Sequence, residues 1–137
     1  MATLNPYLSF RDNARAALEH YHGVLGGDLQ ISTFGSMPEM GYEPSESELV
    51  MHGALTTDDG MVLMASDTPS SMEYQQPQGV SVSVSGQDAD RLRGVWDGLL
   101  DGGTATIPLA PAPWGGEFGM LVDRFGIAWM VSIDQAQ

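Results

Sequence analysis

An internal repeat is the feature that most constrains how this chain folds. Apolar residues recur at positions i, i+3, i+4 and i+7 in two segments, 14–25 and 89–100. Each segment is therefore predicted to form a helix with one apolar face, and each ends at a pair of glycines that suits a helix C-terminus. The two segments share one offset, since 89 − 14 and 100 − 25 both equal 75. This constant offset indicates two copies of one structural unit.

Strand-like runs flank the two predicted helices in the same order. One run precedes each helix, a short one follows it, and two longer runs joined by a tight turn come last. Aligning the turn glycines Gly60 and Gly126 gives an offset of 66 and pairs Met64 with Met130. We therefore predict an α+β fold of two tandem β-α-β-β-β modules. The predicted strands are residues 4–10, 29–34, 49–57 and 61–65, and then 80–85, 104–109, 117–122 and 127–133.

The chain length suits one domain over residues 1–137. We predict a first module over about residues 1–67, a linker over about 68–78 and a second module over about 79–137. A further loop, 35–47, is rich in Pro, Gly, Ser and Glu. That composition suits either a mobile cover over a site or a disordered surface loop.

Polar residues stand at the predicted starts of helices and loops. Asn13 or Asp12 is the expected N-cap of the first helix, and Asp88 is that of the second. Asp67 is expected to cap the loop that begins at Thr68.

The charge balance excludes several classes of function. Eighteen acidic residues face five arginines and no lysine, which gives a net charge of −13. Such a charge repels nucleic acids and anionic membranes, although the acids can equally be read as a solubilising surface. Cysteine is absent, and no apolar run reaches the 18 residues that a membrane helix needs. The N-terminus lacks the pattern of a signal peptide, so we expect a cytoplasmic protein with no nucleic-acid or membrane partner.

The order and spacing of several short motifs resemble the glyoxalase/bleomycin-resistance family, also called the vicinal oxygen chelate superfamily, and most closely its PhnB-like branch. The resemblance implies that each module's mixed sheet curls into a cup, that the modules pair around a shared cavity, and that the protein is a homodimer. Some members of this branch are labelled demethylubiquinone methyltransferases, but we identify no motif for binding a methyl donor. The motifs are NPYLSF, YHGVLGG, VMH, LMASD and WGGEFGMLVDRFGIAWMV.

Metal-dependent members of that superfamily place His, Gln or Glu on the first and last strands of each module. The corresponding positions here fall at Asn5 or Pro6, at Ser81, and at Met64 and Met130. Imino-acid, amide, hydroxyl and thioether side chains are poor ligands for a hard divalent cation. We therefore expect no metal cofactor, and a divalent ion is the alternative.

Two residues are candidates for catalysis. His52 lies on a predicted strand whose face it shares with Val50 and Ala54, where it either packs in the core or addresses a ligand. Glu117 stands near the apolar residues Trp114 and Phe118, where a carboxylate suits a general base, although it is equally read as a solvent-facing edge residue. The predicted ligand-binding residues are Tyr7, His52, Met64, Ser81, Ser83, Trp114, Glu117 and Met130.

Three functions follow from these expectations. The first is binding of a small, partly apolar molecule without chemistry, on a scaffold that lacks the usual metal site. The second is a metal-dependent lyase or dioxygenase of glyoxalase type, with a nonstandard site built on His52 and Glu117. The third is a dimeric interaction module.

Overall fold

The computed structural model describes residues 2–36 and 44–135, and most of the predicted loop 35–47 lies outside the described residues. The chain divides into two compact units, which meet in sequence between Gln76 and Pro77. This boundary falls inside the predicted linker, residues 68–78. No helix in the described part of the chain is long and apolar enough to cross a membrane.

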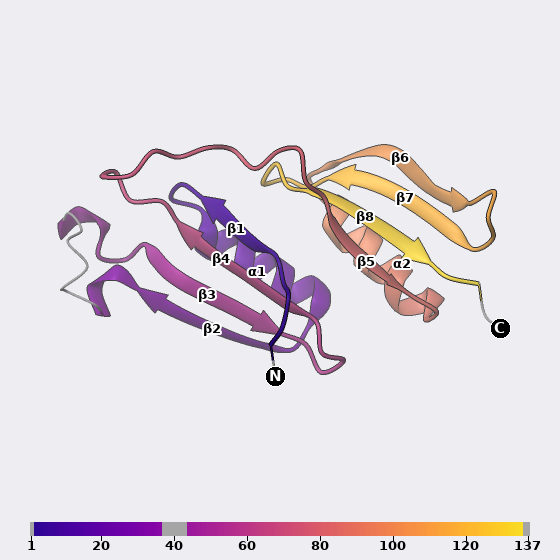
Figure 1. The fold of residues 1–137 in the computed structure, drawn as a ribbon, viewed down its shortest axis with the longest axis horizontal. Helices are drawn as coiled ribbons and strands as arrows, with labels where there is room; N and C mark the ends of the chain where they lie inside the picture. The colour runs from indigo at the N-terminus through magenta and orange to yellow at the C-terminus, as the bar shows by residue number, and fades with distance from the viewer. Residues whose placement is uncertain (1, 37–43, 136–137) are drawn as a thin grey trace. The chain divides into compact units, whose positions relative to one another are not determined.

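Unit 1, which ends at Gln76, is a four-stranded sheet with one long helix (Figure 1). The strand order is β1-β4-β3-β2; β1 runs parallel to β4, and the other neighbours are antiparallel. Two short 3-10 helices, η1 and η3, follow β2. The elements are β1 (Tyr7–Phe10), α1 (Ala14–Leu25), β2 (Asp28–Thr33), η1 (Phe34–Ser36), η3 (Pro44–Glu46), β3 (Val50–Thr56) and β4 (Val62–Asp67).

Unit 2, which begins at Pro77, repeats this architecture with strand order β5-β8-β7-β6. Here β5 is parallel to β8, and the other pairs are antiparallel. Two β-α-β-β-β modules with mixed sheets confirm the predicted α+β fold. The elements are β5 (Val82–Gly86), α2 (Ala89–Leu100), β6 (Thr104–Pro111), β7 (Glu117–Val122) and β8 (Ala128–Ile133).

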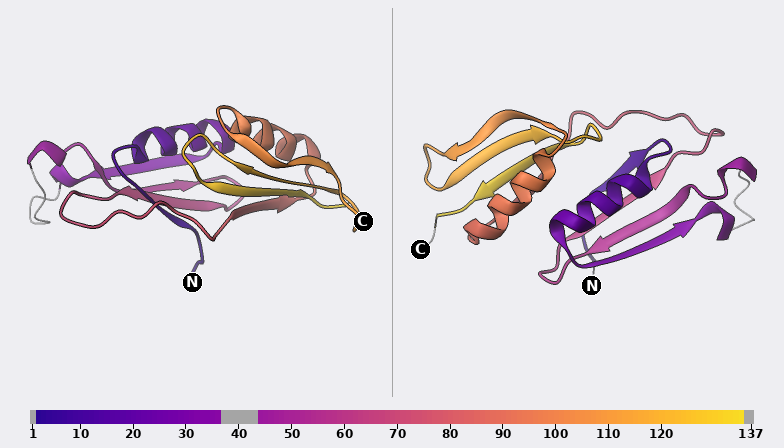
Figure 2. Two further views of the ribbon diagram at one scale, coloured as in Figure 1. Left: turned by 90° about the horizontal axis from the view of Figure 1, so that it is seen from above. Right: turned by 180° about the vertical axis from the view of Figure 1, so that it is seen from behind.

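Each helix covers one face of its own sheet and leaves the opposite face open (Figure 2). Glycines on the central strands permit this close packing. A Cβ at Gly53 would clash with Leu18 of α1, and one at Gly119 would lie 2.8 Å from the Trp96 ring of α2. Because side chains alternate along a strand, residues in step with these glycines face the helix, and their neighbours face away from it.

The start of α1 corrects two predictions. Asn13 makes no side-chain capping bond. Instead, Asp67 at the end of β4 accepts hydrogen bonds from Ala14 N and Val50 N, both at 2.9 Å. The expectation that Asp67 caps the following loop is therefore wrong, and Thr68 N donates to Phe10 O instead. The carboxylate is buried, and it joins a helix N-terminus to two strands of the sheet.

The predicted cap of α2 is confirmed, because the Asp88 side chain accepts a hydrogen bond from Arg91 N. The first strands of the two units, however, repeat with a different offset from the helices. Tyr7 lies opposite Met64 and Ser83 lies opposite Met130, so these strands are 76 positions apart, since 83 − 7 is 76. The residue opposite Met64 is thus Tyr7, one position beyond Pro6.

Candidate functional site

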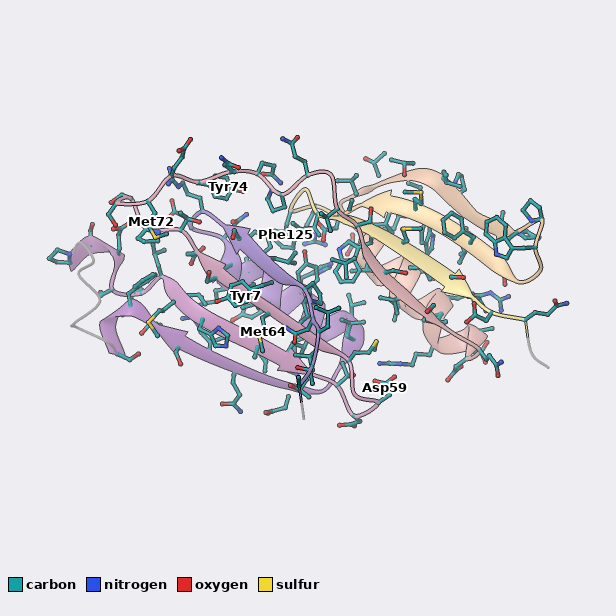
Figure 3. The ribbon with its side chains drawn as sticks, viewed as in Figure 1. Tyr7, Asp59, Met64, Met72, Tyr74 and Phe125 are labelled. Carbon is teal, nitrogen blue, oxygen red and sulfur yellow. The ribbon has the colours of Figure 1, made fainter. Side chains whose placement is uncertain are left out.

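The open face of unit 1 has Met64 at its centre. Across the strands, Tyr7 of β1 pairs with Met64 of β4, Met64 with Ala54 of β3, and Ala54 with Gln30 of β2. Tyr7 and Met64 lie on adjacent strands (Figure 3). Tyr7 is 50% exposed, whereas Met64 and Ala54 are half-buried. The row therefore offers an apolar centre with hydrogen-bonding groups at both ends.

Tyr7 and His52 form the central polar contact of this face. The Tyr7 hydroxyl and His52 Nδ1 are 3.0 Å apart, and the two ring centroids are 5.7 Å apart. Within the described part of the chain, His52 Nε2 has no hydrogen-bond partner. The structure thus brings together three residues that the sequence singled out, Tyr7, His52 and Met64.

A strand irregularity separates His52 from Val50. Ser32 pairs with His52 but Thr33 pairs with Val50, so Met51 is an extra residue on β3. Such a bulge reverses the alternation of side chains. Val50 is fully buried while His52 is half-exposed, so the prediction that they share a face is wrong.

The open face of unit 2 has the same register but is more apolar. Met130 of β8 lies between Ser83 of β5 and Met120 of β7, and Met120 pairs with Ile107 of β6. Polar side chains reach this row only at Ser83, which is exposed. Ser81 is half-buried and precedes β5.

Trp114 extends the apolar face of unit 2. Its ring meets the Phe118 ring edge-to-face at a centroid distance of 5.6 Å, and Trp114 is 68% exposed. Phe118 is one residue out of step with the helix-facing Gly119, so it belongs to the open face. Trp114 therefore lies beside the predicted ligand face of its own unit.

Glu117 does not lie on that face. It is in step with Gly119 on β7, and its carboxylate pairs with the Arg93 guanidinium of α2. The Glu117 carboxylate therefore contacts a cation, where apolar surroundings were expected. The side chains are 52% exposed for Arg93 and 24% exposed for Glu117. His52 belongs to unit 1 and Glu117 to unit 2, and neither unit alone contains both catalytic candidates.

The donor groups at and beside the positions where the sequence resemblance places metal ligands do not fit a hard divalent cation. Met64 and Met130 offer thioethers, and their cross-strand neighbours Tyr7 and Ser83 offer a phenol and a hydroxyl. Among residues 2–36 and 44–135, no three His, Cys, Asp or Glu side chains are grouped as a metal site would require.

Several residues of the two faces were not among the predicted ligand-binding residues. Their signal was the strand alternation itself, which extends from each candidate to its cross-strand neighbours. They are Gln30, Ala54, Ile107, Phe118 and Met120.

Known proteins share this architecture. A family model described as 3-demethylubiquinone-9 3-methyltransferase matches residues 2–132. Protein PA1353 from Pseudomonas aeruginosa is 36% identical, with 99% of this chain and 100% of that chain covered and a TM-score of 0.87. A putative 3-demethylubiquinone-9 3-methyltransferase, PhnB protein, from Bacillus cereus is 21% identical, with 96% and 99% covered and a TM-score of 0.74.

A solved structure of lower sequence identity has the same fold. The glyoxylase/bleomycin resistance protein/dioxygenase domain from Frankia sp. EAN1pec is 14% identical, with 98% of each chain covered and a TM-score of 0.65. The architecture is thus the glyoxalase/bleomycin-resistance fold. The chain belongs to the PhnB-like family described as 3-demethylubiquinone-9 3-methyltransferase, because that family's model matches residues 2–132. The resemblance predicted from the sequence is confirmed.

Proposed function

We propose that this protein binds a small, partly apolar molecule, without chemical change, on the sheet faces that its helices leave open. The observation that carries the proposal is the composition of these faces. Half-buried Met64 and Ala54 lie beside Tyr7 and His52 in unit 1, and half-buried Met120 and Met130 lie beside Ser83 in unit 2. Apolar surface with a few placed polar groups is typical of small-molecule sites.

The methionines suit this role because a thioether side chain is flexible and adapts to the shape of its neighbour. Covering about 100 Å² of apolar surface contributes about 2.5 kcal/mol. The apolar contact can therefore supply attraction while the polar groups select the ligand. In this proposal the protein is a cytoplasmic homodimer that needs no metal cofactor. Its partners include neither nucleic acids nor membranes, because the net charge of −13 repels both.

A metal-dependent lyase or dioxygenase is the first alternative, with a divalent ion at a nonstandard site. It needs Glu117 as a base or ligand, yet that carboxylate pairs with Arg93 on the helix side of its sheet. A dimeric interaction module is the second alternative, in which another copy of the chain covers the half-exposed apolar faces.

A fragment screen read by methionine methyl NMR tests the binding proposal. We expect partly apolar fragments to shift the methyl signals of Met64, Met120 or Met130. Met72, which is 62% exposed and follows the last strand of unit 1, serves as the internal control and should not respond. Fragments that shift Met72 alone, or no methyl at all, would contradict the proposal.

Metal analysis separates the enzyme alternative. Protein purified without chelators should contain no stoichiometric divalent metal, and divalent ions should not raise its melting temperature. Stoichiometric metal together with such a rise would favour the lyase or dioxygenase. Sedimentation across a concentration series tests the homodimer independently of any ligand.

A further inference from the structure

A large aromatic ring is exposed at the end of the sheet in unit 2. Trp114 is 68% exposed, whereas the other two tryptophans, Trp96 and Trp129, are buried. The edge-to-face contact with Phe118 leaves most of the Trp114 side chain accessible. The indole therefore adds little to the core of its unit, and its surface is available to a ligand.

The turn between β6 and β7 holds the backbone of Trp114 in place before any ligand is bound. Gly115 N donates to Ala112 O at 3.0 Å, and Ala112 N donates to Gly116 O at 2.9 Å. Pro113 occupies the second position of this turn, which suits the fixed φ of proline. Gly115 and Gly116 have φ of +98° and +72°, which glycine adopts without strain. Because this segment is already ordered, binding loses little conformational entropy there.

An apolar strip continues from Trp114 along the open face of unit 2. Phe118 and Met120 are two positions apart on β7, so they lie on one face about 7 Å apart. Met120 is the direct cross-strand neighbour of Met130 on β8. Phe118, Met120 and Met130 are all half-buried. These three residues and Trp114 form what we call the aromatic–thioether strip.

The side chains of this strip favour an aromatic ligand over a saturated one. Aromatic rings attract each other in stacked and edge-to-face geometries by more than their buried area accounts for. A thioether sulfur also attracts the edge of an aromatic ring. A saturated ring with the same carbon skeleton buries at least as much apolar area, but it makes neither of these contacts. The strip can therefore distinguish the two by the π system of the ligand.

The strip has no charged group that could pair with an ionised ligand. The four strands of unit 2 contain one charged side chain, Glu117, which pairs with Arg93 on the helix side of the sheet. A negatively charged ligand would also be repelled by the net charge of −13. The surroundings therefore suit an aromatic ring that carries no negative charge.

Resting on the binding function proposed above, we propose that unit 2 binds the flat part of a planar aromatic ligand without negative charge. The ligand ring packs against the Trp114 indole and lies along the strip toward Met120 and Met130. Its contacts are those between aromatic rings and between sulfur and an aromatic ring. No bond of the ligand is made or broken.

Two probes that share one skeleton and one hydroxyl test the proposal: 2-naphthylmethanol and decahydro-2-naphthylmethanol. Each is titrated into the intact protein at neutral pH, and the Trp114 indole and the Met120 and Met130 methyl NMR signals are followed. Burial of apolar area alone would make the saturated probe bind at least as tightly. We expect the aromatic probe to bind about fivefold more tightly, as one favourable ring–ring contact implies. The Met72 methyl in unit 1 is the internal reference.

Trp114→Leu keeps an apolar side chain at the turn and removes the indole. We expect the preference for the aromatic probe to fall to about twofold or less. Trp114→Phe restores an aromatic ring and should keep most of the preference. Val80→Ala is the matched control, because Val80 is 78% exposed, precedes β5 and is in step with the buried Val84, away from the strip. It should keep the full preference, and amide spectra of all three variants verify folding.

Equal binding of the two probes, or tighter binding of the saturated one, would overturn the aromatic selectivity while leaving the binding function intact. The same holds if Trp114→Leu keeps the full preference, or if the probes shift only the Met64 signal of unit 1.

Another copy of the chain is the competing occupant of the strip. In that case the Trp114 indole signal should change on dilution of the protein, and neither probe should shift it. This result would overturn the proposal in favour of the interaction module. If neither probe shifts any of these signals at millimolar concentration and dilution has no effect, the proposal is also overturned, and the wider fragment screen decides the binding function separately.

Discussion

Asp123 gives the sharpest test of what stabilises unit 2. Its carboxylate is buried at the turn between β7 and β8. Oδ1 accepts from Phe125 N at 2.8 Å and from Ile127 N at 3.0 Å, and Oδ2 accepts from the indole Nε1–H of Trp129 at 2.9 Å. One side chain thus closes the hairpin turn and fixes the largest fully buried side chain of the core.

Asp123→Ala should destabilise unit 2 severely. The bonds to Ile127 N and Trp129 Nε1 are buried, and each donor left without a partner costs about 1–3 kcal/mol. Phe125 N is only partly buried, so water can replace its bond at a smaller cost. The two buried donors together predict a loss of about 4 kcal/mol in the free energy of unfolding. Asp123→Asn should lose about half of that, because the amide can serve only one of the two sides.

Denaturant titration followed by tryptophan fluorescence measures this loss. All three tryptophans lie in unit 2, so their emission reports the unfolding of that unit. Asp134→Ala is the control, because Asp134 is exposed and, among residues 2–36 and 44–135, its side chain accepts only a long 3.3 Å bond from Ser132. It should change stability by less than about 0.5 kcal/mol. A loss below about 1 kcal/mol in Asp123→Ala, or equal losses in Asp123→Ala and Asp134→Ala, would refute the reasoning.

Three further predictions concern single residues. His52→Ala should keep the amide spectrum of the fold but alter fragment binding at the Met64 methyl, and global unfolding would make His52 a core residue instead. Gly126→Val should cost about 2–3 kcal/mol by denaturant titration, because the residue has φ +85°, which a β-branched side chain adopts only under strain. Gly94→Ala should instead raise stability by about 0.5–1 kcal/mol, since an added Cβ there meets no atom within 4 Å inside α2, and any loss would contradict that geometry.

Local sequence patterns predicted the helices well because the signal is itself local. Apolar spacing and the flanking glycines gave residues 14–25 and 89–100, and α1 and α2 have these bounds. The first strand was predicted from residue 4 but begins at Tyr7, where pairing with Met64 begins. The ends of an edge strand such as β1 are set by its pairing with the neighbouring strand, and that strand, β4, is distant in sequence.

The misplaced site residues have the same physical origin. Asp67 bonds to Ala14 N, 53 positions away, and no local pattern encodes that contact. The bulge that removes Val50 from the face of His52 depends on the register with β2. Glu117 is different, because its alternation with Gly119 and Leu121 was readable and already indicated the helix side of the sheet. There, proximity in sequence to Phe118 was wrongly taken for proximity in space.

Comparison of the two open faces explains why duplication alone does not define a site. Met64 and Met130 occupy the same register position, each on the last strand of its unit and next to the first. The residues at the neighbouring positions differ between the units. Unit 1 has Tyr7, Ala54 and Gln30 where unit 2 has Ser83, Met120 and Ile107. The open face of unit 1 therefore has more hydrogen-bonding groups, and the open face of unit 2 has more apolar surface. Since apolar area supplies attraction without direction, whereas hydrogen bonds demand matched partners, selectivity for the polar groups of a ligand is expected to reside in unit 1.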